Sequence, residues 1–130
     1  MKKLVVTFCL LAAGLATSLY GQKVEKEGKI WLDSKQGAPE VSVNGTWVSR
    51  EWGKVILNQA EGSRDIVGTG DGWNILGAVT GKKVYLVFSS RGRVAYTAEL
   101  TAESPNLMNG NYSRGLLFPG SKTRSMLLTR

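Results

Sequence analysis

The sequence predicts an all-β protein whose single domain, residues 41–130, folds as an eight-stranded antiparallel up-and-down (meander) barrel. The first observation is spacing: short β-type runs recur roughly every ten residues after residue 41, separated by turns rich in Gly, Pro, Asn, Asp and Ser. The second is the glycine content, 16 of 130 residues, which exceeds the ~7% that is usual in globular proteins. The third is that this region holds no long apolar stripe with the i, i+3, i+4, i+7 spacing of a helix.

Before the domain, residues 1–22 have the pattern of a secretory signal peptide. Two lysines precede an apolar run over residues 4–16, which is shorter than the about 20 residues that cross a bilayer. Small residues at 16–18 fit the cleavage rule, so we expect the mature chain to begin between residues 19 and 23. The protein is therefore expected to be exported, to the periplasm or the extracellular space.

A short membrane anchor and a buried N-terminal helix are the alternative interpretations of this segment. A lipid anchor on Cys9 is disfavoured, because the bulky Phe8 precedes the cysteine and the apolar run continues past it. Cleavage removes Cys9 and two lysines, which leaves 15 basic and 10 acidic residues and a formal charge of +5. Without cysteine, the mature domain has to be stabilised by packing and by closing its own sheet.

The chain contains no histidine and one cysteine. These counts exclude His-based metal sites, Ser-His-Asp and Cys-His catalysis and internal disulfides. The carboxylates Asp65, Asp71 and Glu99 are interpreted as turn or surface groups, so we expect a non-enzymatic protein with no catalytic residue, no metal and no cofactor. The basic residues are spread along the chain without stacking aromatics between them, so nucleic acid is not the expected partner. A charge of +5 does favour weak contact with an anionic membrane or glycan surface.

Residues 23–40 are polar and charged, and we expect them to form an N-terminal arm whose apolar group Ile30-Trp31-Leu32 docks on the domain. The eight strands are expected at residues 41–48, 54–59, 64–69, 73–79, 83–88, 93–100, 106–114 and 123–130. Short links make consecutive strands antiparallel neighbours, and closure of the sheet removes both exposed edges.

Four glycines fall inside the expected strands and indicate bends or close approach of neighbouring backbones, as a small barrel requires: Gly45, Gly68, Gly77 and Gly110. A flat β-sandwich with glycine bulges is the alternative. Alternation in the sixth strand places Val94, Tyr96, Ala98 and Leu100 inward, with Thr97 and Glu99 outward.

Gly45-Thr46-Trp47 in the first strand, together with a basic residue in the last, resembles the signature of the calycin barrels, the lipocalins and avidins. The resemblance implies that Trp47 plugs the closed end of the barrel and that Arg124 or Arg130 lies over its ring as a cation–π partner. Residues 44–69 resemble an avidin-type opening in particular. The avidin ligand set has no match here and the lipocalin helices have no room, so a calycin-like barrel is implied and biotin binding is not.

Aromatic residues are spread over the expected strands and allow two interpretations. In one they fill the interior of a small barrel. In the other, Trp52, Trp73 and Tyr96 line a cup at the open end, where a nearby amide orients a ligand. The amides considered are Asn58, Gln59, Asn74 and Asn109.

Two functions follow from these interpretations. The first is an exported, non-catalytic binding module that takes a small, partly apolar ligand. The alternative is a structural or envelope-associating protein with a filled barrel, whose basic surface contacts anionic lipid or glycan.

Overall fold

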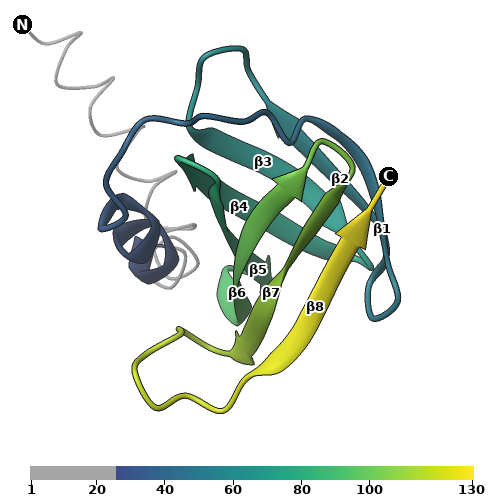
Figure 1. The fold of residues 1–130 in the computed structure, drawn as a ribbon. Helices are drawn as coiled ribbons and strands as arrows, with labels where there is room; N and C mark the ends of the chain where they lie inside the picture. Colours follow the sequence, from purple (N-terminus) through teal and green to yellow (C-terminus); the bar gives the residue numbers. More distant parts are fainter. Residues whose placement is uncertain (1–25) are drawn as a thin grey trace, which may run out of the picture.

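The computed structural model describes residues 26–130, and residues 45–129 form a closed barrel of antiparallel strands (Figure 1). Each strand pairs with the next in the sequence, and β8 returns to pair with β1. The strands are β1 (Gly45–Ser49), β2 (Gly53–Gln59), β3 (Asp65–Gly70), β4 (Trp73–Thr80), β5 (Lys83–Ser90), β6 (Arg93–Ser104), β7 (Leu107–Arg114) and β8 (Arg124–Thr129). The predicted eight-stranded meander barrel is confirmed, and the sandwich alternative is wrong. The expected signal peptide lies outside the described residues.

The hairpins follow from the turn residues. Asp71 and Gly72, between β3 and β4, have φ of 51° and 80°, and Arg91 and Gly92, between β5 and β6, have φ of 53° and 75°. Two successive residues with positive φ are typical of the tight hairpin turns whose twist matches that of the strands. Odd-numbered strands therefore run toward one end of the barrel and even-numbered strands run back.

Alternate side chains of the strands fill the interior. Its fully enclosed members include Val55, Leu57, Ile66, Ile75, Val84, Leu86, Phe88, Ala98, Leu100, Met108, Met126 and Leu128. Three strand glycines sit where a neighbouring backbone leaves no room for a Cβ: one on Gly68 would overlap the carbonyl oxygen of Ile56, one on Gly110 that of Glu99, and one on Gly77 would lie 2.6 Å from that of Tyr85. Close approach at these glycines is confirmed, and it draws the strands into a narrow barrel.

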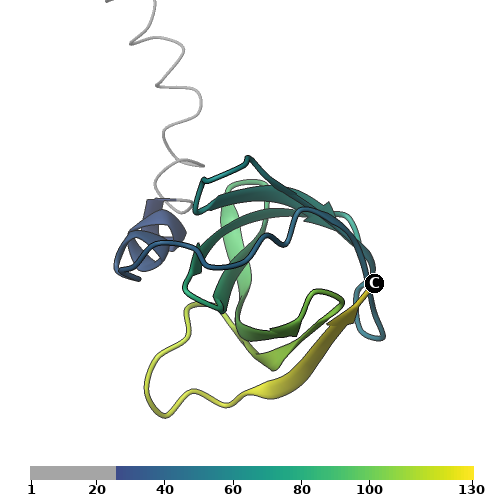
Figure 2. The ribbon, with the colours of Figure 1, turned by 45° about the horizontal axis from the view of Figure 1, so that its top comes forward.

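A second apolar cluster lies on the outer wall, under a helix that covers residues 26–33 within the described part of the chain. Figure 2 shows this helix outside the ring of strands. Trp31 and Leu32 are buried against Tyr85 and Val87 of β5, whereas Ile30 is 59% exposed. The expected docking of the arm is therefore confirmed for two of its three apolar residues, and the helix itself was not predicted.

The sixth strand departs from simple alternation. The pairing of β5 with β6 shifts after Phe88, where Phe88 faces Tyr96 and Ser89 faces Val94. This irregularity turns Val94 outward into the cluster under the helix, so its predicted inward orientation is wrong. Tyr96, Ala98 and Leu100 face inward as predicted.

Candidate functional site

The two ends of the barrel differ, and one of them is closed by residues of the chain itself. Trp47 is 1% exposed there, and its indole Nε1 donates a hydrogen bond of 2.9 Å to the Val43 carbonyl. The guanidinium carbon of Arg130 lies 4.2 Å from the centroid of the Trp47 ring. Arg130 also donates to the carbonyls of Asn44, at 2.7 Å, and Pro105, at 2.8 Å. The Trp47 ring, the Arg130 guanidinium and these backbone carbonyls thus close this end of the barrel, and we call them together the stopper.

The contact between Arg130 and Trp47 depends on a glycine at position 45, two residues before the tryptophan. Its φ is 141°, and a Cβ built on it would lie 2.8 Å from Nη1 of Arg130. Of the two basic residues that the resemblance left open, the structure places Arg130 over Trp47. Arg124 begins β8 at the opposite end, across from Tyr112, so its assignment to the plug is wrong.

Gln59 belongs to the same closed end. Its side-chain oxygen accepts from the Val43 N–H at 2.8 Å, and its amide nitrogen donates to the Ser63 carbonyl at 2.8 Å. Asn58 points outward from β2 and is exposed. Neither residue reaches the aromatic residues at the other end, because β2 runs away from that end. Their predicted role as ligand amides is therefore wrong, and Gln59 instead holds the segment before β1.

The open end gathers five aromatic side chains, which we call the aromatic cluster: Trp52, Trp73, Phe88, Tyr96 and Tyr112. Trp52 stacks on Phe88 with ring centroids 4.7 Å apart and planes 20° apart. Tyr96 and Tyr112 meet the Trp52 ring edge-to-face at 5.0 and 5.5 Å, and Trp73 meets Tyr96 at 5.7 Å. Such edge and offset contacts are the favourable geometries for aromatic rings.

Trp52, Trp73 and Tyr96 were predicted to lie together, and the structure brings them together. Tyr112 was missed, although strand pairing indicates it: it lies across from Ala98, two residues along β6 from Tyr96 on the same face of the sheet. Asn74 was predicted to join the site, but it is exposed on the outward face of β4, opposite Ser89. No amide of the predicted set therefore faces the aromatic cluster.

Trp52 is held by the turn between β1 and β2. The Ser49 hydroxyl oxygen accepts from the backbone N–H of Trp52 at 3.2 Å and from that of Glu51 at 3.2 Å, and Ser49 donates to the Glu51 carboxylate at 3.0 Å. This turn buries the ring to 7% exposure. Its indole Nε1 is enclosed without any hydrogen-bond partner. A buried donor without an acceptor destabilises the fold by about 1–3 kcal/mol. Trp52 carries this cost, whereas Trp47 does not, because its indole N–H is hydrogen-bonded.

A recess of about 300 Å³ opens beside the aromatic cluster. It is lined by Tyr96, Tyr112, Ser113, Arg114, Lys122 and Arg124. In the pairing of the strands, Arg114 faces Tyr96 and Arg124 faces Tyr112. Directly paired residues share a face of the sheet, so both arginines occupy positions on the inward side, at the rim of the barrel. The recess combines two phenol rings with three cationic side chains.

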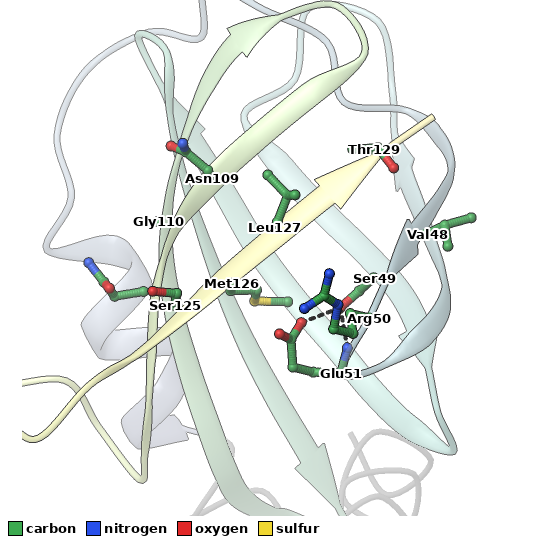
Figure 3. A pocket seen from close by; sticks show the side chains of 11 residues that line it. Val48, Ser49, Arg50, Glu51, Asn109, Gly110, Ser125, Met126, Leu127 and Thr129 are labelled. Atoms are coloured by element: carbon green, nitrogen blue, oxygen red, sulfur yellow. Dashed lines mark hydrogen bonds between the residues drawn. The ribbon is translucent and has the colours of Figure 1, made fainter.

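A larger hollow, of about 820 Å³, lies elsewhere, on the outer wall where β1 and β8 share only two paired positions. Figure 3 shows its lining, with Glu51 bonded to Ser49 and Leu127 and Val48 on the surrounding strands. Met126, 1% exposed, closes the seam toward the interior. This hollow contains no aromatic side chain and does not touch the aromatic cluster, so the open end is the candidate site.

No protein-family model, curated protein or solved structure matches this chain. The closed eight-stranded barrel is compatible with the calycin-like fold that the sequence resembles. Residues 26–130 include no helix long and apolar enough to cross a membrane. The same residues hold no group of three His, Cys, Asp or Glu side chains that could bind a metal ion.

Proposed function

We propose that this protein is an exported, non-catalytic binding module of the calycin type, which holds a small, partly apolar ligand at the open end of the barrel. The observation that carries the proposal is the unpartnered indole N–H of Trp52 inside the aromatic cluster. Recognition sites of this class combine apolar walls with a few polar groups that orient the ligand. The aromatic cluster supplies the walls, and the N–H supplies a donor that nothing in the described chain satisfies.

The aromatic cluster also indicates how a ligand would enter. Trp73, Tyr96 and Tyr112 are partly exposed, whereas Trp52 and Phe88 are buried beneath them. An acceptor atom reaches Trp52 Nε1 when Tyr96 or Tyr112, both in edge contact with the Trp52 ring, turns aside. The ligand ring then stacks against the tyrosine that has turned, while its oxygen or nitrogen accepts a hydrogen bond from the indole N–H.

A titration with the neutral fluorescent probe phenylnaphthylamine tests this proposal. We expect probe fluorescence to rise and tryptophan emission to be quenched, with a dissociation constant in the micromolar range. Tyr112→Ala should weaken binding of the probe at least about fivefold. Stacking on one aromatic side chain contributes about 1–3 kcal/mol to the binding of a flat nucleobase, and we expect a similar contribution for the flat rings of the probe. Val48→Ala, a change on the exposed outer face of β1, is the matched control and should leave binding unchanged. Absence of saturable binding would refute the proposal.

A second candidate function is contact with anionic lipid or glycan through the basic open end, by a barrel whose interior is filled by its own side chains. Its supporting observation is that Phe88 and Trp52 already occupy the interior beneath the rim. It predicts retention on an anionic surface that salt reverses, without any quenching of tryptophan by phenylnaphthylamine.

A further inference from the structure

We infer that the ligand of the open end is an anion: a flat apolar body carrying a carboxylate, phosphate or sulfonate that Arg114, Lys122 and Arg124 bind. This inference rests on the proposed function, since it names the chemical class of ligand for the same site. It is carried by the placement of the three cations and by the absence of a partner for their side chains within residues 26–130.

The placement is unusual for a barrel interior. Along β7 and β8 the inward positions hold Met108 and Met126, both fully buried, before they reach Tyr112, Arg114 and Arg124 at the rim. Arg114 and Arg124 therefore continue the inward-facing rows of their strands to the rim, where both side chains are exposed to solvent. Lys122, from the loop between these strands, completes the lining of the same 300 Å³ recess.

None of these three cations is neutralised. Within residues 26–130, Arg114, Lys122 and Arg124 form no side-chain hydrogen bond or ion pair, and no carboxylate lines their recess. Arg130 at the closed end contrasts with them, since its guanidinium is engaged by two carbonyls and a ring. Three like charges around one small recess repel each other, and a bound anion would relieve that repulsion.

The chemistry of the recess defines the ligand further. Guanidinium groups present paired N–H donors that match the oxygens of carboxylate, phosphate or sulfonate. The neighbouring Tyr96 and Tyr112 rings lead from these cations to Trp52. A molecule with a flat ring joined to an anionic group would match both the aromatic and the cationic parts of the site. Its ring packs in the aromatic cluster, and its anion lies among the cations at the rim.

The test compares two probes that differ only in charge, anilinonaphthalene sulfonate and phenylnaphthylamine, which is the same molecule without the sulfonate. We expect the sulfonate to bind about tenfold tighter at low salt, because each of two or three exposed ion pairs strengthens binding by about two- to fivefold. The advantage should shrink in about 0.5 M salt, where charges are screened within a few ångströms.

The variants separate the charge effect from the fold. Arg114→Gln with Arg124→Gln should remove most of the sulfonate's advantage, leaving the part that Lys122 contributes, and should leave the neutral probe's affinity unchanged, which also shows that the site is still folded. Lys29→Gln with Lys82→Gln removes the same charge from exposed positions away from the rim and should change neither affinity.

The outcomes are distinguishable. If neither probe binds, the proposed function fails. If both bind equally, the binding module stands and the anionic ligand is refuted. If the sulfonate binds no tighter but the protein pellets with phosphatidylglycerol vesicles, and the arginine variant does not, the rim cations contact a membrane surface and the inference is again refuted.

Discussion

Arg130 should be the residue on which the closed end depends most, and Arg130→Ala tests this. The substitution removes two charge-assisted hydrogen bonds, to the Asn44 and Pro105 carbonyls, and the cation over the Trp47 ring. Hydrogen bonds to charged groups contribute about 1.5–3 kcal/mol each, and an exposed cation–π contact contributes about 0.5–1 kcal/mol. Because Arg130 is itself solvent-exposed and water can hydrogen-bond the two carbonyls after its removal, we expect a loss of about 2–3 kcal/mol, which is below the sum of these contributions.

The assay is urea denaturation followed by tryptophan fluorescence, with the free energy of unfolding extrapolated to water. Arg124→Ala is the matched control: it removes the same kind of side chain from the start of β8, where the guanidinium has no hydrogen bond to the described part of the chain, and it should change stability by less than about 0.5 kcal/mol. Arg130→Lys should fall between the two. Lysine keeps the charge over the ring, but a single ammonium replaces the forked donor that reaches two carbonyls.

The reasoning about the stopper is refuted if Arg130→Ala and Arg124→Ala have equal stability. A large loss for both variants would also refute it, because the effect would then follow from net charge rather than from the contacts at Trp47.

Two further changes test the barrel wall and the helix on it. Gly110→Ala places a methyl group against the Glu99 carbonyl of the neighbouring strand and should lower the free energy of unfolding by about 3 kcal/mol or more. Gly62→Ala, in a turn with open space around it, is the control and should lower it by about 1 kcal/mol, because of its positive φ alone. Equal melting temperatures for the two variants would contradict this account. Burial, and secondarily the charge of Glu99, raises the pKa of Tyr85. The unfolded phenol therefore loses its proton first, so this contribution to stability is present below about pH 10 and is lost as the pH rises through the folded pKa. Tyr85→Phe should flatten the alkaline fall in stability measured by near-UV circular dichroism, and an unchanged profile would contradict the assignment.

The strands were predictable because their signals are local. Alternation and turn residues mark the hairpins, and links that are short everywhere except between β7 and β8 leave the meander as the simplest topology. The helix over residues 26–33 was not predictable in this way. Half of its residues are charged and one is Gly28, and it is stabilised by an apolar patch on β4 and β5 that exists only once the barrel has formed. A Cβ on Gly28 would lie 2.9 Å from Val87, so the glycine serves close packing rather than flexibility.

The errors at the site have a different origin. Given the meander, strand direction alone assigns each residue to an end: β2 and β8 both run toward the closed end. Gln59, at the end of β2, therefore lies near Trp47, and Arg124, at the start of β8, lies at the opposite end. The sequence thus contained the information that separates Arg130 from Arg124. Conversely, the outward turn of Val94 depends on a bulge whose position no local signal marks.

The two tryptophans of the barrel interior provide the last test, because both are buried and, within the described residues, only the N–H of Trp47 has an acceptor. Trp47→Phe removes ring volume, breaks the hydrogen bond to Val43 and leaves that carbonyl without its partner. Trp52→Phe removes a similar volume but also removes a donor that had no acceptor. Trp52→Phe should therefore cost at least about 2 kcal/mol less than Trp47→Phe in urea denaturation. If the Trp52 ring only fills space, Trp52→Phe should not change binding of anilinonaphthalene sulfonate. If its N–H donates to the ligand, Trp52→Phe should also weaken binding of this probe. Equal stability losses and unchanged probe binding would together show that Trp52 is merely part of the core.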